Sequence, residues 1–592
     1  MEPAIQAAVD RWLLDPAIAQ TDKDEIRALV ENGDTRELTD RFHANLEFGT
    51  GGIRGIIGAG PNRMNLYTVG AAAQGLANYI GRHGESAKKA GVAIACDCRR
   101  MSDAFSRRVA RVLAANGVTA HRCKALRPTP LLSFAVRRMG CTAGVMITAS
   151  HNPPEYNGLK AYWSDGGQVV PPQDGEIIEE VRRVGAYANI REMSEEKGRS
   201  CRLIRDVGAD VDAAFLEQVD RSCLAREACR AQGEKLRIVF SPLHGTGGTL
   251  IPEALRRRGF RHVMEVPEQS VPDGDFPTVK SPNPEEGPAL AMAIDLAKGE
   301  RADLVIASDP DADRIGIAVR DGNERYRLLT GNQVSALLTF YLCEQLTRSK
   351  RFPADAVVLT TIVSGDMMKE IARSYGAEVV EVLTGFKWIA ERVRLYEEAR
   401  RAGQPSRTYV FGAEESYGYM PCDFVRDKDA VTSSAMIAEA AAFAASEGKT
   451  LLDILDELFR RYGYFEEGAK SITLPGADGS ARIDAMMADL RNNPPRRLGG
   501  EAVQTWADLT NGEVRDIHTD TVVGRYDLPA SNVIMLTLDD GAKVIARPSG
   551  TEPKIKFYIL VRQPADDLAA ARLAAASRIQ AISAELQEQA SG

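Results

Sequence analysis

The chain has 592 residues, of which 44% are hydrophobic and 26% are charged, a composition typical of a folded globular protein rather than a disordered or fibrous one. The formal net charge of −8 does not favour binding to nucleic acid, although a local positive pocket could still bind an anionic metabolite. The length is too great for a single core, so we expect several domains of about 100–200 residues each.

The sequence gives no sign of export or membrane insertion. The first residues, 1–4, carry no basic segment before an apolar one, and no uninterrupted apolar run reaches spanning length. Nine cysteines are scattered along the chain; Cys96 and Cys98 are too close for an ordinary disulfide, and no second pair is spaced for zinc. We therefore expect a reduced cytoplasmic protein that binds neither membranes nor nucleic acid.

The first 140 residues predict an α/β domain behind a helical extension. Residues 1–45 are charged and place Ile5, Val9, Trp12 and Leu13 on one helical face. Further on, predicted helices at 69–80 and 102–116 alternate with a strand at 92–95 and a proline-rich turn at 127–130. This alternation is typical of a mostly parallel sheet.

A glycine-rich segment, residues 49–55, contains one arginine, Arg54. Glycines allow the backbone to approach a ligand closely, and arginine can bind phosphate through two parallel hydrogen bonds. The spacing matches neither a Walker loop nor a dinucleotide fingerprint. The segment is either a simple turn or a phosphate contact.

A serine follows the predicted strand at 143–147. Ser150 lies in the stretch Thr148–Pro154, and the residues 155–158 are expected to continue this loop. Ligands collect at the carboxyl ends of strands in open α/β sheets. Lys160 could fold back toward the same point. Ser150 is thus either a turn residue or part of a functional loop.

Three carboxylates follow another predicted strand, at 304–307. Asp309, Asp311 and Asp313 would repel one another unless a cation lies among them, and their oxygen atoms suit Mg²⁺. An EF-hand is excluded because its sixth and twelfth positions would hold Arg314 and Arg320. A solvated acidic turn is the alternative.

Three later loops carry further polar groups. Residues 383–387 form one notable loop. A second loop, 412–419, offers adjacent carboxylates and hydroxyls suited to sugar hydroxyls, although it could also be a helix start. Residues 547–554 join predicted strands at 543–546 and 555–560, and their cations and hydroxyls suit an anion better than an ordinary hairpin turn.

Together these loops predict phosphoryl transfer through a phosphoserine, with a metal and cations neutralising the phosphoryl oxygens. A serine hydrolase is disfavoured because the G-x-S-x-G elbow is missing, and a kinase because no nucleotide loop is found. A non-catalytic sugar-phosphate binding protein would be expected to lack Ser150 or the aspartates, and all are present.

Five motifs also resemble a known family. The segments 148–153, 309–314, 412–417 and 547–551 look like the four signature loops of the α-D-phosphohexomutases, and 49–54 is similar to their N-terminal signature. They occur in family order, and the resemblance covers about 45–565. The length and the Gly385-Phe386-Lys387 loop resemble the phosphoglucomutase/phosphopentomutase branch.

The resemblance implies four domains around a central cleft: three similar α/β domains and a smaller C-terminal α+β domain. We place the boundaries at 1–225 (with the helical extension and the phosphoserine loop), 226–334 (metal loop), 335–468 (sugar loop) and 469–592 (phosphate loop). The fourth domain is expected to be mobile.

The resemblance also implies the site. Ser150 would carry the phosphoryl group and, with Asp309, Asp311 and Asp313, hold Mg²⁺. Catalytic groups would be Ser150, Lys160, His151 and Arg54; substrate-binding groups Thr384, Gly385, Lys387, Glu414, Ser416 and Arg314; phosphate-binding groups Arg547, Ser549, Gly550, Thr551 and Lys554.

The implied reaction interconverts glucose 1-phosphate and glucose 6-phosphate through glucose 1,6-bisphosphate, which turns over in the cleft. Mannose phosphate or a pentose phosphate is the alternative substrate, and the chain would be a monomer or a dimer. For the general acid or base we favour Lys160, since burial can lower a lysine pKa. His151 is second, because neighbouring strand residues point opposite ways and it would not face Ser150.

Overall fold

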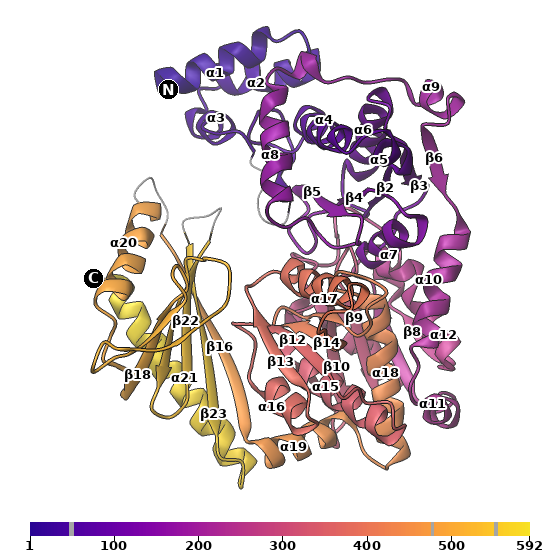
Figure 1. Cartoon of the computed structure of the whole chain (residues 1–592). Helices are drawn as coiled ribbons and strands as arrows, with labels where there is room; N and C mark the ends of the chain where they lie inside the picture. The colour runs from indigo at the N-terminus through magenta and orange to yellow at the C-terminus, as the bar shows by residue number, and fades with distance from the viewer. Residues whose placement is uncertain (47–51, 475–478, 550–553, 592) are drawn as a thin grey trace. The chain divides into compact units, whose positions relative to one another are not determined.

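The computed structural model describes residues 1–46, 52–474, 479–549 and 554–591 (Figure 1). The chain forms two compact units. Unit 1 comprises Met1–Gly331, Phe386–Arg407 and Phe411–Ser446, and unit 2 comprises Asn332–Gly385, Thr408–Val410 and Glu447–Gly592.

The N-terminal extension is helical, as the sequence predicts. It consists of α1 (Pro3–Leu14), α2 (Gln20–Glu31) and α3 (Thr35–Phe42). Ile5, Val9 and Trp12 of α1 are buried in one apolar cluster with Phe42 and Tyr67. The Trp12 ring meets the rings of Phe42 and Tyr67 edge-on, at centroid distances of 6.0 and 5.4 Å. These contacts fix the extension to the first α/β domain.

The first sheet of unit 1 has six strands in the order β1-β5-β4-β2-β3-β6. The strands are β1 (Ile53–Ile56), β2 (Val92–Cys96), β3 (Ala120–Cys123), β4 (Ala143–Ile147), β5 (Tyr156–Trp163) and β6 (Ile204–Val207). Strands β4, β2, β3 and β6 are parallel, whereas β5 runs antiparallel to both β4 and β1. The predicted parallel sheet is therefore confirmed, with an antiparallel edge.

Helices cover both faces of this sheet because the central strands are apolar on both sides. Figure 1 shows α4 (Leu66–Arg82) and α6 (Ser102–Ala115) on one face and α7 (Thr129–Met139) on the other. Apolar residues of α4 and α6, such as Val69 and Val109, share one core with Val92, Ile94 and Val145 of the strands.

The second sheet of unit 1 has the order β11-β10-β9-β7-β8. Its strands are β7 (Arg237–Ser241), β8 (His262–Glu265), β9 (Leu304–Ser308), β10 (Ile315–Arg320) and β11 (Tyr326–Leu329). Strands β8, β7 and β9 are parallel, and β10 returns antiparallel to β9. Helix α14 (Gly287–Glu300) packs on β7 and β9, while α18 (Ala430–Ser446) contacts β9 and β10.

A third sheet has the order β13-β12-β14-β15. In unit 2, β12 (Ala356–Thr361) and β13 (Glu378–Val382) are parallel, and β14 (Thr408–Glu414) continues the chain into unit 1, where it pairs antiparallel with β15 (Gly418–Met420).

The three sheets repeat one arrangement: a strand leads into a polar loop, and the chain returns on an antiparallel strand. The pairs are β4 and β5, β9 and β10, and β14 and β15. Each intervening loop contains one non-glycine residue with left-handed backbone, namely Ser150 (φ 51°), Ala312 (φ 51°) and Tyr417 (φ 63°). The predicted functional loops therefore occupy equivalent places in three sheets.

Three predicted loop boundaries were wrong. Residues 156–158 belong to β5 rather than to a loop, because they pair with β1. Residues 412–414 belong to β14, whose hydrogen bonds continue to β15. Phe386 and Lys387 begin α17 (Phe386–Arg401).

The C-terminal sheet of unit 2 is antiparallel throughout, in the order β16-β23-β22-β21-β18-β19-β20, with β17 paired to β18. The strands are β16 (Tyr464–Thr473), β17 (Arg497–Leu498), β18 (Glu501–Asp508), β19 (Glu513–Asp516), β20 (Val522–Arg525), β21 (Ile534–Leu538), β22 (Lys543–Pro548) and β23 (Lys554–Gln563). Helices α20 (Gly479–Asn492) and α21 (Leu568–Ser591) pack against this sheet.

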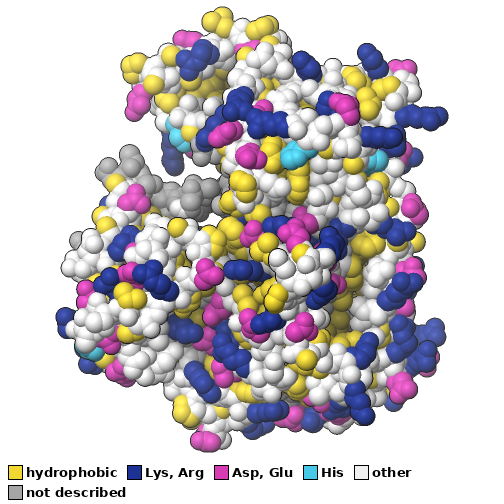
Figure 2. All heavy atoms as spheres, in the orientation of Figure 1, with side chains coloured by type: hydrophobic (Ala, Val, Ile, Leu, Met, Phe, Trp, Pro, Cys, Tyr) yellow, Lys and Arg dark blue, Asp and Glu magenta, His cyan; other side chains and the backbone are white. Residues whose placement is uncertain are grey.

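The remaining helices connect these layers. They are α5 (Glu85–Ala90), α8 (Gln173–Val184), α9 (Glu195–Ser200), α10 (Ala209–Arg221), α11 (Arg226–Gln232), α12 (Ile251–Arg258), α13 (Pro267–Ser270), α15 (Gly331–Arg348), α16 (Met367–Ser374) and α19 (Leu451–Tyr462). Among the residues that the structure describes, no helix has both the length and the apolar character needed to cross a membrane. On the face shown in Figure 2, basic and acidic side chains are interspersed.

Candidate active site

Ser150 lies directly beyond the end of β4, in a loop that the return strand β5 holds in place. Its side chain is buried, and its Oγ donates a 2.6 Å hydrogen bond to Oδ2 of Asp309. The left-handed backbone at Ser150 turns the chain sharply, and the Thr148 hydroxyl accepts a 2.8 Å hydrogen bond from the Ser150 N–H. The serine and the predicted metal loop are therefore in direct contact.

A buried arginine that the sequence analysis did not single out supports the serine loop. Arg99 donates to the backbone carbonyls of Ser150 (2.6 Å), Pro153 (2.8 Å) and Tyr156 (3.0 Å), and also to that of Asn152. Asp97 lies 3.4 Å from the Arg99 guanidinium, and both side chains are fully buried. One rigid cation thus fixes the loop backbone that carries Ser150.

The aspartate triplet, Asp309, Asp311 and Asp313, is gathered in one buried cluster. One carboxylate oxygen from each residue lies within 4.8 Å of the others, which is a spacing suited to a shared metal ion. Oδ1 of Asp311 and Oδ1 of Asp313 are buried without a hydrogen-bond partner. Buried carboxylate oxygens without partners are costly, so these atoms fit a bound cation. The triplet could therefore hold a metal.

Backbone contacts fix the shape of this metal loop. Oδ1 of Asp309 accepts hydrogen bonds of 3.0 Å from the N–H groups of Asp313 and Arg314. Thr246 donates to the Pro310 carbonyl from its N–H at 2.8 Å and from its hydroxyl at 3.0 Å. At Gly245 a Cβ atom would lie 2.4 Å from Pro310 Cα, so only glycine permits this approach. The glycine-rich loop after β7 thus supports the metal loop.

Thr129 joins the metal loop to the first domain. Its hydroxyl donates to Oδ2 of Asp311 at 2.8 Å, and its N–H donates to the Asp311 carbonyl at 2.9 Å. Thr129 comes from the proline-rich turn before α7, which the sequence analysis noted only as a turn.

Lys160 lies on β5 and contacts the aspartate triplet, beside Ser150 as the sequence suggested. Its pKa, however, is raised rather than lowered as we expected. Its Nζ is 2.8 Å from Oδ2 of Asp311 and 3.1 Å from Oδ2 of Asp313. Burial lowers the pKa of Lys160, but the two carboxylates outweigh burial and the net shift is upward. The expectation of a lowered lysine pKa was wrong, because the sequence did not reveal these partners.

The argument against His151 was also wrong in its geometry. We expected His151 to point away from Ser150 as neighbouring strand residues do. Ser150 is instead in a left-handed turn, and Nδ1 of His151 lies 3.3 Å from Ser150 Oγ. Burial lowers the pKa of His151 well below its ordinary value, and the charges of Arg314 and Arg54 lower it further. At neutral pH this imidazole is therefore uncharged.

A second lysine at the triplet was missed. Nζ of Lys428 lies 3.1 Å from Oδ2 of Asp313, and the side chain is buried. Burial raises the pKa of Asp313, but Lys160, Lys428 and Arg314 outweigh burial and lower it overall. The run 426–429, which places four charged residues immediately before an alanine-rich helix, was the signal in the sequence.

The predicted cations and sugar-binding groups extend from this cluster. Arg54 on β1 donates a 2.8 Å hydrogen bond to the Asn152 side chain, in the serine loop. Arg314 forms a 2.6 Å ion pair with Glu285. The N–H of Ile315 donates to the Tyr417 carbonyl at 3.1 Å, so the loop that carries Glu414 and Ser416 lies beside Arg314. Burial lowers the pKa of Arg314, but the carboxylates around it, Glu285 first and buried Glu414 among them, outweigh burial and raise it.

Other predicted site residues line a different cavity or belong to unit 2. Nζ of Lys387 is 3.2 Å from Oδ2 of Asp174. Lys387 also lines a cavity of about 720 Å³, and neither Ser150 nor the aspartate triplet is among the residues that line this cavity. Thr384 and Gly385 belong to unit 2. Arg547, Ser549 and Lys554 also belong to unit 2, at the end of the β22–β23 hairpin, where the Ser549 N–H donates to the Lys554 carbonyl at 2.7 Å. Gly550 and Thr551 lie outside the described residues.

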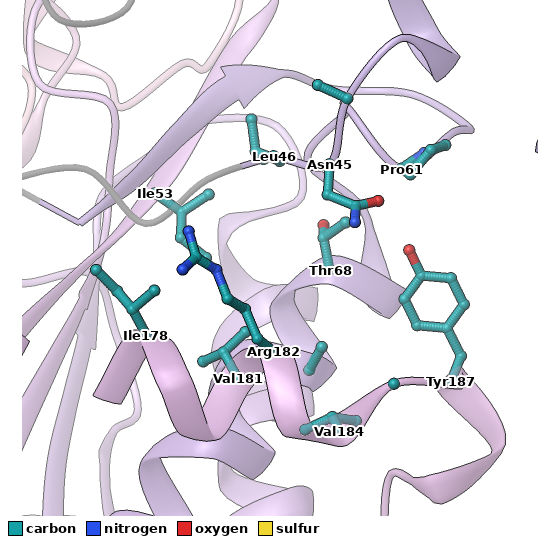
Figure 3. Close-up of a pocket in the computed structure, with 13 residues that line it drawn as sticks. Asn45, Leu46, Ile53, Pro61, Thr68, Ile178, Val181, Arg182, Val184 and Tyr187 are labelled. Carbon is teal, nitrogen blue, oxygen red and sulfur yellow. The ribbon is translucent and has the colours of Figure 1, made fainter. Parts of the chain in front are cut away.

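Figure 3 shows another cavity, of about 260 Å³, between α4, α8 and residues 44–46. Its labelled lining mixes apolar side chains such as Ile178 and Val181 with Thr68, Arg182 and Tyr187. None of the predicted catalytic side chains lines it.

Family models cover most of this architecture. The models for phosphoglucomutase/phosphomannomutase α/β/α domains I, II and III match residues 45–188, 201–322 and 330–462. The chain is also 36% identical to a phosphoglucomutase of Staphylococcus aureus (strain USA300) over 545 residues, which cover 92% of this chain and 95% of that protein.

Solved structures share the fold at lower identity. The open form of parafusin, a phosphoglucomutase from Paramecium, gives a TM-score of 0.64 at 16% identity and covers 92% of this chain and 95% of its own. A phosphoglucomutase/phosphomannomutase family protein from Burkholderia thailandensis gives 0.62 at 19% identity, covering 93% and 98%. With three matching domains and a relative of full length, this chain belongs to the phosphoglucomutase/phosphomannomutase family of α-D-phosphohexomutases and is an isomerase, a phosphohexose mutase.

Proposed function

We propose that this mutase interconverts glucose 1-phosphate and glucose 6-phosphate, with Ser150 as the residue that carries the phosphoryl group. The observation that supports this role most directly is the 2.6 Å hydrogen bond between Ser150 Oγ and Asp309 Oδ2. It places a hydroxyl beside a carboxylate cluster with buried oxygens that lack partners. The 36% identity to a phosphoglucomutase supports glucose as the hexose.

The transfer has two balanced halves. Phospho-Ser150 gives its phosphoryl group to the 6-hydroxyl of glucose 1-phosphate, which produces glucose 1,6-bisphosphate and a free serine hydroxyl. After the bisphosphate turns over, Ser150 accepts the 1-phosphoryl group and glucose 6-phosphate leaves. The number of phosphoryl groups is unchanged, so a trace of bisphosphate suffices to phosphorylate the serine at the start.

The chain's own residues hold and neutralise the phosphoryl group. Asp309, Asp311, Asp313 and the phosphoryl oxygen on Ser150 would hold Mg²⁺, which neutralises phosphoryl charge during transfer. Lys160 and Lys428 remain charged beside the carboxylates, since their pKa values are raised despite the effect of burial. Arg99 keeps the serine backbone in place, and Arg54 and Arg314 supply positive charge at the edge of the cluster.

Several further assignments belong to this proposal. Glu414, Ser416 and the Thr384–Lys387 segment would bind sugar hydroxyls, and Arg547, Ser549, Gly550, Thr551 and Lys554 would bind the phosphate that is not transferred. Domain boundaries at 225, 334 and 468, a cytoplasmic location and a monomeric or dimeric state are likewise predictions.

The test is a ³¹P NMR time course of the purified protein with Mg²⁺ and a trace of glucose 1,6-bisphosphate. Separate samples contain glucose 1-phosphate, mannose 1-phosphate and ribose 1-phosphate. We expect the glucose sample to convert fastest to the 6-phosphate, without free phosphate. Faster conversion of mannose 1-phosphate or ribose 1-phosphate would identify that sugar phosphate as the substrate instead of glucose phosphate. Release of free phosphate alone would overturn the mutase reaction. In the same protein, mass spectrometry should detect a phosphoryl group on the tryptic peptide that contains Ser150.

A further inference from the structure

A pair of cysteines lies apart from the catalytic cluster along the chain, within the second matched family domain, residues 201–322. Cys223 is in the connection between α10 and α11, and Cys229 is within α11. The two sulfur atoms and a carboxylate oxygen of Glu439 all lie within 4.8 Å of one another. Neither cysteine is in a disulfide.

The Glu439 carboxylate is already engaged and does not compete for a ligand. Its Oε1 accepts hydrogen bonds from the N–H groups of Leu224 (2.6 Å) and Ala225 (2.7 Å). Its Oε2 forms an ion pair with Arg258, and both of these side chains are fully buried. A guanidinium this close disfavours a divalent cation. The cluster is therefore suited to chemistry between the two sulfurs rather than to a metal.

The environment favours one thiol as the nucleophile. Cys223 is partly exposed, whereas Cys229 is buried. Interaction with the Cys229 thiol lowers the pKa of Cys223 most, and the charges of Arg258 and Arg226 lower it further against the opposing effect of burial. The same interaction raises the pKa of Cys229. A reachable thiolate beside a protonated thiol is the arrangement of an attacking and a resolving cysteine.

We propose that Cys223 and Cys229 are a reversible redox pair that forms an intramolecular disulfide when a peroxide oxidises the protein. The Cys223 thiolate attacks one peroxide oxygen, the O–O bond breaks, and a sulfenic acid and hydroxide form. The Cys229 thiol then attacks the sulfenic sulfur, the S–S bond forms, and the sulfenic oxygen leaves as water once protonated. Overall two thiols and H₂O₂ give one disulfide and two waters, and a dithiol reverses the reaction.

Cys422 is a competing candidate for the bridge. The charge of Arg258 acts on this thiol too, but burial outweighs it. Burial raises the pKa of Cys422 to about 12, so it remains protonated at neutral pH. The bridge is therefore assigned to Cys223 and Cys229.

The test is peroxide oxidation of the folded, full-length protein followed by differential alkylation. Protein reduced with a phosphine is treated in the folded state with a series of H₂O₂ concentrations and is then unfolded in guanidinium, so that iodoacetamide also reaches the buried Cys229. It is next reduced again and alkylated with N-ethylmaleimide, and its peptides are analysed by mass spectrometry. We expect Cys223 and Cys229 to acquire the second label together and in equal amounts. Without the second reduction, the tryptic peptides 222–226 and 227–230 should remain joined, with a combined mass about 2 Da below the sum of the two unlabelled thiol peptides. Cys201, which is exposed, should keep the first label. The far-ultraviolet circular dichroism spectrum should be unchanged, because the sulfurs are already neighbours.

Variants separate the possible outcomes. In Cys229→Ser, a dimedone adduct should accumulate on Cys223, whereas Cys223→Ser should give neither adduct nor bridge, and Cys422→Ser should leave the bridge intact. The proposal is overturned if Cys223 and Cys229 keep the first label at peroxide concentrations that oxidise Cys201. It is also overturned if Cys422 is the bridged partner, or if the reduced protein holds one equivalent of zinc that Cys223→Ser removes. The wild-type labelling decides the matter even if Cys229→Ser fails to fold.

Discussion

The hydroxyl of Ser150 and the carboxylate of Asp309 are joined by a 2.6 Å hydrogen bond, although 159 residues separate them along the chain. Each residue follows the last residue of a central strand closely, Ser150 after β4 and Asp309 after β9. Each strand is followed by an antiparallel return strand, β5 after β4 and β10 after β9, which holds its loop in place. The contact between Ser150 and Asp309 brings the proposed phosphoryl carrier to the proposed metal ligands.

Ser150→Ala should reduce kcat for phosphoglucose conversion by at least about a thousandfold, because alanine has no hydroxyl to accept the phosphoryl group. The thermal unfolding midpoint should fall only slightly, since serine and alanine bear similar left-handed strain at this position and one side-chain hydrogen bond, to Asp309, is lost. Coupled mutase assays and calorimetry check both expectations. Ser200→Ala, at an exposed position, is the matched control. Near-normal kcat in Ser150→Ala would refute the phosphoserine mechanism.

Asp311→Asn should weaken the apparent Mg²⁺ affinity by at least about tenfold, because a neutral amide binds a hard divalent cation less well than a carboxylate. Hydrogen bonding by Thr129 can persist in this variant, so loss of packing is small. The measurement is a Mg²⁺ titration of mutase rate together with calorimetric Mg²⁺ binding. An unchanged titration would mean that the triplet is only a structural turn.

Arg99→Lys should lower kcat by at least about tenfold while changing KM little, because Arg99 positions the serine backbone rather than touching the sugar. Lysine cannot reproduce the planar fork that reaches four carbonyls, and the unfolding free energy should fall by about 2–4 kcal/mol. Arg100→Lys is the matched control, since Arg100 is exposed and pairs with Asp275. Equal kcat values for the two variants would exclude a positioning role for Arg99.

Gly245→Ala should displace the loop that carries the aspartate triplet, although Gly245 is not itself a metal ligand. The added Cβ would lie 2.4 Å from Pro310 Cα, so the loop must shift, and we expect about tenfold weaker Mg²⁺ affinity and a loss of about 1–3 kcal/mol in stability. At Gly248 the nearest atom, in the Pro242 ring, lies 3.6 Å from an added Cβ, so Gly248→Ala should change stability by less than about 0.5 kcal/mol. The measurements are the thermal unfolding midpoint and the Mg²⁺ titration of both variants. Equal values for Gly245→Ala and Gly248→Ala would show that the close approach of Gly245 to Pro310 is not needed for Mg²⁺ binding or stability.

Asp429 should make stability depend on pH. Burial raises its pKa to about 6, above the ordinary value of 3.8, while hydrogen bonds from Thr432 partly oppose the rise. The folded state therefore binds the Asp429 proton more tightly than the unfolded state does. The contribution of the protonated carboxyl to the unfolding free energy is fully present below about pH 4 and is lost as the pH rises to about 6. The wild type should lose about 3 kcal/mol relative to Asp429→Asn over this window, as urea unfolding at several pH values would measure.

The exposed control, Asp520→Asn, should keep the wild-type pH profile. If Asp429→Asn and the wild type changed in parallel between pH 4 and 6, the buried carboxyl would not be the source of the dependence.

The local pattern of the sequence was enough to predict the strands that carry the site. Apolar runs at 143–147 and 304–307 became β4 and β9 with almost the same ends. The spacing of the aspartates was enough to predict a carboxylate cluster, because three acidic side chains so close in one short loop cannot lie far apart. The alternation of helices and strands likewise predicted the α/β class.

Loop boundaries were less predictable. Residues 156–158 read as a loop because prolines and glycine surround them, yet they form the start of β5, since pairing with β1 outweighs their weak local preference. Local composition cannot reveal a partner strand that is about 100 residues away.

The sequence by itself therefore determined the fold class, the order of the functional loops and the chemical type of each loop. Only the tertiary structure decided which groups face one another: Lys160 and Lys428 on the triplet, His151 beside Ser150, and Arg99 beneath the serine loop. The directions of their pKa shifts followed from those neighbours. Strand patterns and short motifs are local properties of the chain, whereas charge partners and burial arise only when distant segments meet.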